Sequence, residues 1–102
     1  MTGETLQRKV TVTNPHGFHM RPAALFAQTA GRFQSDVTLW RDDKRINGKS
    51  PLELMFLAAE CGTELTLEVS GADAAAAIEP LVKILAAPSA DDLPDLTDLP
   101  QA

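Results

Sequence analysis

Three segments of the chain alternate apolar and polar residues, which is typical of strands with one buried face. They span residues 6–13, 36–41 and 64–69, and their apolar positions include Val10, Val37 and Leu65. Asp42 and Asp43 form a polar turn after the second segment, so a short strand is predicted at 44–47. Residues 14–17 (NPHG) end the first strand, because proline and glycine both disfavour its continuation.

Two helices are predicted between these strands. Residues 20–31 are rich in alanine at helical spacing, and Gly31 suits a helix end. Ser50 and Glu53 have the spacing of a capping box, in which each side chain binds a backbone N–H of the first turn. Pro51 then occupies the first helical position, where no N–H is needed. The second helix is therefore expected to begin at residue 51 and to end before Gly62.

A third helix is predicted after Asp73, which is expected to cap it. One apolar stripe supports this helix, made of Ala74, Ile78, Leu81, Val82 and Leu85. Pro80 lies inside the pattern, so a kink or a late start is expected. The predicted order is βαββαβα. It indicates an α+β, open-faced two-layer sandwich: a four-stranded antiparallel sheet with three helices on one face.

Acidic residues are concentrated at the end of the chain. The net charge is −5, and the segment 88–102 contributes −4 through Asp91, Asp92, Asp95 and Asp98. The rest holds 10 acidic against 9 basic residues, which argues against nucleic-acid binding. Residues 1–87 are expected to form one domain, and residues 88–102 a disordered Asp/Pro-rich tail.

The location of the protein follows from three further features. The only cysteine, Cys61, cannot form an internal disulfide and is expected to be packed. No apolar run approaches the roughly 18 residues that a membrane helix needs. The N-terminal residues are too polar for a secretory signal. A cytoplasmic protein that does not bind membranes is therefore expected. We also expect it to be a monomer.

The segment 14–23 (NPHGFHMRPA) holds the candidate chemistry. If a helix begins at Met20, the backbone N–H groups of Met20 and Arg21 lack intrahelical partners, and Pro22 has none to lose. Such a start attracts anions, and the guanidinium of Arg21 matches phosphate oxygens. His19 beside it is a nucleophile near neutral pH, and Gly17 allows the loop to present its ring. The pattern predicts phosphoryl transfer on His19.

Other interpretations of His19 stay open at this point. The residue could serve only as a helix cap or as a partly buried polar group. A metal site with His16 lacks a third ligand at suitable spacing, and Arg21 would repel a cation. A hydrolytic enzyme would need more polar residues around His19. Neither a metal nor a cofactor is expected.

The segment from Gly17 to Ala23 resembles the active-site signature of the HPr family, the histidine phosphocarriers of the bacterial phosphoenolpyruvate-dependent phosphotransferase system. The resemblance continues in register over residues 6–87, through segments 47–50, 62–64 and 81–83. It implies that enzyme I phosphorylates His19 on Nδ1, that Arg21 binds the phosphate, and that an EIIA-type domain receives it. The protein would then be a carrier for sugar transport or regulation, and not an enzyme that turns over small molecules.

The same resemblance implies a second phosphorylation site at Ser50, the regulatory serine that HPr kinase/phosphorylase modifies in many members. The capping box explains Ser50 equally well, and Pro51 replaces the apolar residue usual after that serine. The alternative function is therefore a regulatory interaction module controlled through Ser50.

An apolar docking surface for partners is predicted beside His19, made of Met20, Leu52, Met55 and Phe56. Leu54, Leu57 and Ala58 are expected to face inward. Many sugar-transport members carry lysines where this chain has Gln28, Gly31 and Glu53. Docking is therefore expected to depend less on charge, and a purely regulatory phosphorelay stays open.

Overall fold

The computed structural model of the 102-residue chain describes residues 4–57 and 59–87. Its elements follow the predicted order. They are β1 (Glu4–Thr11), α1 (Met20–Ala30), β2 (Asp36–Arg41), β3 (Lys44–Asn47), α2 (Pro51–Met55), β4 (Glu64–Gly71) and α3 (Ala74–Ala86).

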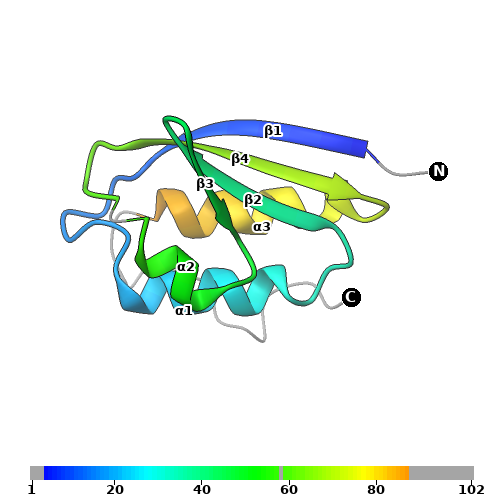
Figure 1. The fold of residues 1–102 in the computed structure, drawn as a ribbon, viewed down its shortest axis with the longest axis horizontal. Coiled ribbons are helices and arrows are strands. Elements are labelled where there is room, and N and C mark those ends of the chain that lie inside the picture. Colours follow the sequence, from blue (N-terminus) through cyan, green and yellow to red (C-terminus); the bar gives the residue numbers. More distant parts are fainter. Residues whose placement is uncertain (1–3, 58, 88–102) are drawn as a thin grey trace.

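The four strands form one sheet in the order β1-β4-β2-β3, and all three pairs are antiparallel. The helices cover one face of this sheet, and its other face is open (Figure 1). The predicted α+β, open-faced two-layer sandwich with the order βαββαβα is therefore confirmed.

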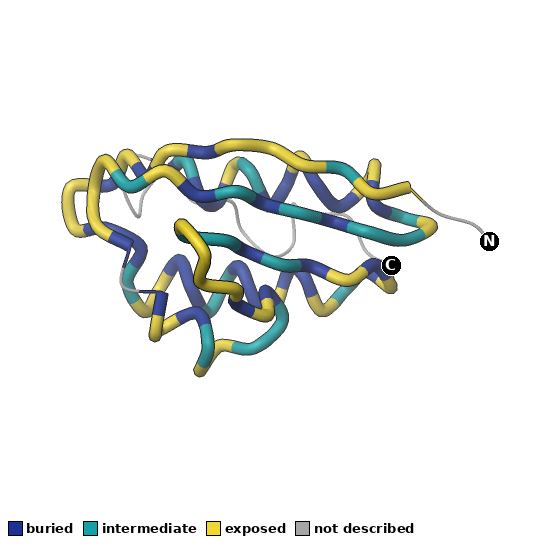
Figure 2. The backbone as a smooth tube through the Cα atoms, turned by 45° about the horizontal axis from the view of Figure 1, so that its top comes forward, coloured by how far each residue is buried: buried dark blue, intermediate teal, exposed yellow. Residues whose placement is uncertain are grey.

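The core lies between the sheet and the helices. Buried residues alternate along most of β2 and β4 (Figure 2), and they are Val37, Leu39, Leu65, Leu67 and Val69. Phe26 of α1 packs into the same core. Each large apolar side chain buried in this way contributes about 1.5–3 kcal/mol to folding, so the period-two pattern of the strands fixes the sheet's inner face.

The limits of the first strand differ from the prediction of residues 6–13. β1 is Glu4–Thr11, and Val12 is buried just beyond it. The N–H of Val12 donates to the carbonyl of Thr63 at 2.9 Å, and its carbonyl accepts from the N–H of Gly62 at 2.7 Å. The start of the strand depends on β4, which continues to Gly71 and pairs with Glu4.

The third helix confirms most of its predicted stripe. Ala74, Ile78, Leu81 and Leu85 are buried, and Val82 is partly buried. Pro80 lies inside the helix, which nevertheless begins at Ala74, so a late start is wrong.

Asp73 stands at the N-cap position of α3, but its side chain does not cap the helix. Its carboxylate accepts the N–H groups of Gln34, at 2.8 Å, and Ser35, at 2.9 Å, and also the hydroxyl of Ser35. The Ser35 hydroxyl and then the Gln34 N–H lower the pKa of Asp73, because both donate to its charged form. The predicted cap is wrong because the loop at residues 34–35 offers three donors.

Two predictions fall on residues outside the described part of the chain. They are the inward orientation of Ala58 and the disorder of the tail at 88–102. Within residues 4–57 and 59–87, no helix is long and apolar enough to cross a membrane.

Candidate functional site

The loop before α1 takes its shape from Gly17. This residue has φ +74°, and its N–H donates to the carbonyl of Asn14 at 2.8 Å. A Cβ added to Gly17 would lie 2.7 Å from the carbonyl oxygen of Ala59. Both the left-handed backbone and the close approach therefore require glycine, as predicted for a loop that bends sharply before the histidine.

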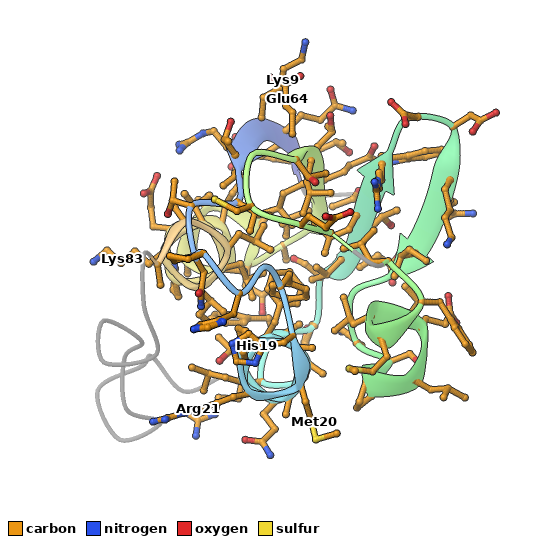
Figure 3. The ribbon with its side chains drawn as sticks, turned by 90° about the vertical axis from the view of Figure 1, so that its left-hand side faces the viewer. Lys9, His19, Met20, Arg21, Glu64 and Lys83 are labelled. Carbon is orange, nitrogen blue, oxygen red and sulfur yellow. The ribbon has the colours of Figure 1, made fainter. Side chains whose placement is uncertain are left out.

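Phe18 anchors the loop to the core. Its side chain is buried and meets Phe26 edge to face, with ring centroids 6.0 Å apart. Its N–H donates to the carbonyl of Ala59 at 2.8 Å. Because the side chain of Phe18 points into the core, the next residue, His19, lies at the surface, half-buried, at the N-terminal end of α1 (Figure 3).

His19 occupies the N-cap position of α1 with extended backbone, φ −95° and ψ −166°. Its side chain makes no capping hydrogen bond, so the interpretation of His19 as a side-chain cap is wrong. The ring of His16 stands edge to face with that of His19, with the two centroids 6.2 Å apart. The imidazole of His19 is therefore accessible and is not used to hold the helix together.

The first turn of α1 leaves backbone donors open. The N–H of Ala23 donates to the carbonyl of His19 at 3.0 Å, and Pro22 has no N–H. The N–H groups of Met20 and Arg21 make no hydrogen bond with any described residue. Two donors beside the His19 ring are thus available to an anion, as the sequence predicts.

Arg21 is exposed and forms no ion pair or hydrogen bond within the described residues. Its guanidinium points away from the His19 ring, although both side chains lie at the same end of the molecule (Figure 3). The rotatable bonds of arginine allow the group to turn toward a phosphate on His19. The fold places Arg21 near the site but does not hold it in contact with the imidazole.

A shallow cavity of about 500 Å³ opens beside the His19 ring. Cys61 lies on its wall and is exposed, with its Sγ 3.6 Å from the carbonyl oxygen of Thr13. The expectation of a packed cysteine is therefore wrong. Within residues 4–57 and 59–87, no three His, Cys, Asp or Glu side chains are grouped closely enough to hold a metal ion. The cavity is lined by Pro15, His16, Gly17, Phe18, His19, Ala59, Glu60 and Cys61.

At the second helix, only half of the predicted capping box is present. The hydroxyl of Ser50 accepts the N–H of Glu53 at 3.2 Å. The carboxylate of Glu53 accepts the N–H of Asn47 at 3.0 Å, and the N–H of Ser50 donates to the carbonyl of Asn47 at 3.2 Å. The N–H of Ser50, which the Glu53 carboxylate would accept in a complete capping box, is already bonded to Asn47. The Glu53 carboxylate instead accepts the N–H of Asn47, the last residue of β3.

Four large apolar side chains are exposed on α1, on α2 and at the residue that follows α2, and the two helices pack against each other. Leu54 and Leu57 face inward and are fully buried, as predicted. We call the four exposed side chains the docking patch: Met20 is 69%, Leu52 67%, Phe56 60% and Met55 42% exposed. This much apolar surface beside the His19 loop is typical of a protein contact site.

Comparison with known proteins agrees with this geometry. The family model described as the PTS HPr component phosphorylation site matches residues 6–87. The chain belongs to the HPr family. It is thus a phosphocarrier of the HPr type.

Individual relatives include both carriers and an HPr-like protein. The chain is 50% identical over 76 residues to the HPr-like protein Crh of Bacillus subtilis (strain 168), covering 74% of this chain and 89% of that protein. It is 46% identical over 77 residues to the phosphocarrier protein HPr of Treponema pallidum (strain Nichols), covering 76% and 88%.

Solved structures show the same architecture. The phosphocarrier protein HPr from Bacillus anthracis str. Ames superposes with a TM-score of 0.75 at 38% identity, covering 79% of this chain and 96% of that one. A crystal structure of Bacillus subtilis Crh gives a TM-score of 0.63 at 48% identity, covering 78% and 92%, and is described as a dimer with a swapped domain.

Proposed function

We propose that His19 accepts a phosphoryl group on Nδ1 from enzyme I and passes it to an EIIA-type domain. One observation carries this proposal: an accessible imidazole, free of any capping role, stands beside the two open N–H groups of Met20 and Arg21. The family match over residues 6–87 supports the same reaction class.

The chemistry requires little beyond positioning and charge neutralisation. The lone pair of Nδ1 attacks phosphorus, a P–N bond forms, and the bond between phosphorus and the donor breaks. The N–H groups of Met20 and Arg21 and the guanidinium of Arg21 then bind the phosphoryl oxygens. Transfer to the acceptor reverses these steps, so the protein is restored and acts as a carrier.

The test is phosphorylation of the full chain with phosphoenolpyruvate and enzyme I, comparing His19→Ala with His16→Ala. The two histidines lie three residues apart with rings in edge-to-face contact, so His16→Ala is a matched control. We expect an acid-labile, base-stable phosphate on the wild type and on His16→Ala, and none on His19→Ala. Phosphate retained by His19→Ala, or lost only from His16→Ala, contradicts the assignment of the site.

A second candidate function is regulation through Ser50. Ser50 is half-buried at the start of α2, and Leu52 of the docking patch follows it by two residues. A phosphate there would add nearly two negative charges at the edge of that patch and repel acidic partners. The relative Crh, described as a catabolite repression protein, is consistent with this alternative.

Ser50→Asn separates the two uses of this side chain. Asparagine caps a helix about as well as serine but carries no hydroxyl to phosphorylate. With an HPr kinase/phosphorylase and ATP we expect an acid-stable phosphate on the wild type and none on Ser50→Asn, with thermal stability nearly unchanged. An unmodified wild type, with a kinase that is active on another HPr, contradicts this second function.

The proposed partners are therefore enzyme I, an EIIA-type domain and an HPr kinase/phosphorylase, all met in the cytoplasm, where phosphoenolpyruvate is available. We propose that residues 1–87 form the carrier domain and that the protein acts as a monomer. Light scattering after gel filtration tests the last point, because a dimer of this chain, like the one described for Crh, would have twice the mass of the 10.9 kDa monomer.

A further inference from the structure

The turn between β2 and β3 is joined directly to α2. Arg41 and Lys44 are paired across the end of this hairpin, around the turn Asp42–Asp43. Arg41 donates from one guanidinium nitrogen to the carbonyl of Leu57 at 2.9 Å, and the ammonium of Lys44 donates to the carbonyl of Phe56 at 2.6 Å. The two carbonyls lie immediately after the last residue of α2.

The strand register explains why these two side chains reach the helix. Leu39 and Ile46 point into the core, and side chains two residues apart on a strand share a face. Arg41 follows Leu39 by two residues, and Lys44 precedes Ile46 by two. The side chains of Arg41 and Lys44 therefore extend from the face of the sheet that the helices cover. They lie at the edge of the core, next to α2.

The helix α2 needs such external contacts. It has five residues, and helices shorter than about 12 residues are marginal in water without tertiary contacts. Leu54 and Leu57 are buried in the core beneath the helix, and the hydroxyl of Ser50 accepts the N–H of Glu53 in its first turn. The two cations bind the carbonyls at its other end, which the helix itself leaves open.

We propose that Arg41 and Lys44, which we call the hairpin clamp, are positioning residues for the docking of enzyme I. They fix the end of α2 and thereby hold Met55 and Phe56 in the docking arrangement, the position near His19 in which a partner can contact them. Phe56 is directly involved, because its own carbonyl is the acceptor for Lys44. The clamp touches neither His19 nor Arg21 in the structure, so its effect belongs to binding and not to transfer. This inference rests on the proposed transfer from enzyme I to His19 and on the predicted use of the docking patch in that contact.

A positive charge near a docking surface can also act by attracting an acidic partner, and salt separates that effect from positioning. Long-range attraction is largely screened when the Debye length falls from about 10 Å at about 0.1 M salt to about 3 Å at about 1 M. A misplaced helix stays misplaced at either salt concentration. An effect of the clamp that persists at the higher concentration therefore reports position.

The experiment compares Arg41→Met/Lys44→Met with Lys9→Met/Arg45→Met in the full chain. The control also removes two positive charges, but from the open face of the sheet. There the guanidinium of Arg45 lies 5.9 Å from the centroid of the Trp40 ring. Phosphoryl transfer from enzyme I is measured for each at both salt concentrations. If the clamp variant holds the docking arrangement about a tenth of the time, its KM rises about tenfold. Its kcat should match the wild type, and the KM of the control should rise less.

Amide hydrogen exchange provides a readout that needs no partner. We expect the amides of α2 and of Phe56 to exchange faster in the clamp variant, while those of Leu65 and Leu67 in β4 stay protected. The single variant Lys44→Gln, which keeps an N–H donor without the charge, should lie close to the wild type. If the double variant fails to fold, the single variant Lys44→Met replaces it in both measurements, and it should show a smaller change in the same direction.

Three results overturn the clamp: unchanged exchange in α2, a KM effect that disappears at about 1 M salt, or an equal effect in the control. If the wild type accepts no phosphate from enzyme I, the proposed function fails instead. In that case the exchange measurement still decides whether Arg41 and Lys44 hold α2.

Discussion

The helices α1 and α3 begin at opposite ends of the molecule and treat their first residues in opposite ways (Figure 1). At the start of α3, the carboxylate of Asp73 binds three donors of the 34–35 loop, and its carbonyl accepts the N–H groups of Ala76 and Ala77. At the start of α1, the His19 side chain does not cap the helix, and the next two N–H groups make no hydrogen bond with any residue that the structure describes.

The difference separates stability from function within one fold. The end of the molecule at Asp73 uses its polar groups to join segments 38 and 39 residues apart in the chain. The end at His19 leaves donors unused that a transient phosphate can bind, and it forgoes the stability that capping would add. Side-chain substitutions at the two helix starts, Arg21 at one and Asp73 at the other, should therefore affect different measurements, whereas the backbone of the loop before α1 still contributes to stability through Gly17.

The largest effect is expected from Gly17→Ala. Alanine at this φ is strained, and its Cβ would meet the Ala59 carbonyl, so we expect a loss of about 3 kcal/mol in the free energy of unfolding. Urea denaturation measures the loss, and Gly62→Ala is the matched control. Gly62 also has positive φ but open space around its Cβ. Equal losses in both variants would show that the contact with Ala59 contributes nothing.

Arg21→Met should affect phosphoryl transfer alone. The guanidinium has no partner among the described residues, so the urea midpoint should not change. The rate of phosphorylation should fall between about tenfold and about a hundredfold, because one charged donor to the phosphate is lost. The rate is measured as the amount of phosphorylated chain formed over time with phosphoenolpyruvate and enzyme I. A full rate in Arg21→Met would remove the arginine from the proposed site.

Asp73→Ala should have the opposite effect to Arg21→Met: it should lower stability and leave phosphoryl transfer unchanged. Three donors lose their acceptor, and the two on the fully buried Ser35, its N–H and its hydroxyl, have least access to water, so we expect a loss of about 2 kcal/mol in stability. The initial rate of phosphorylation at a temperature where the variant stays folded should equal that of the wild type. A slower rate in the folded variant would mean that the two ends of the molecule are coupled, which contradicts the separation of stability from function.

The smallest effect is a dependence on pH. The pKa of Asp73 lies below its ordinary value of 3.8 in the folded protein, mainly through the Ser35 hydroxyl. Its contribution to stability is therefore complete above the ordinary value and is lost as pH falls through the lowered one. The difference in urea midpoint between the wild type and Asp73→Ala should shrink in that acid range. A difference that stays constant down to about pH 2 would contradict the lowered pKa.

Local patterns predicted most of the fold. The limits of β2 and β3 and the first residue of α1 agree with the sequence, because alternation, the Asp42–Asp43 turn and Pro22 are signals within a few residues of each boundary. The open N–H groups at α1 were predictable for the same reason. They depend on where the helix starts and on a proline in its first turn.

The errors share a different cause. Glu53 and Asp73 each have the residue type of a cap, but each binds a donor that the fold brings close: the Asn47 N–H for one, the 34–35 loop for the other. The end of β1 and the exposure of Cys61 likewise depend on neighbours from other segments. The clamp of Arg41 and Lys44 gave no signal in the sequence, because two charged residues at a hairpin end are typical of any surface turn.

The most direct test of the open helix start follows the backbone amides during phosphorylation. In ¹H–¹⁵N spectra of the full chain, with and without phosphate on His19, the amide protons of Met20 and Arg21 should move strongly downfield as they bind phosphoryl oxygens. Those of Gln34 and Ser35, already bound to Asp73, should stay in place. Phosphorylation of His19 with the Met20 and Arg21 amides unmoved would contradict the account.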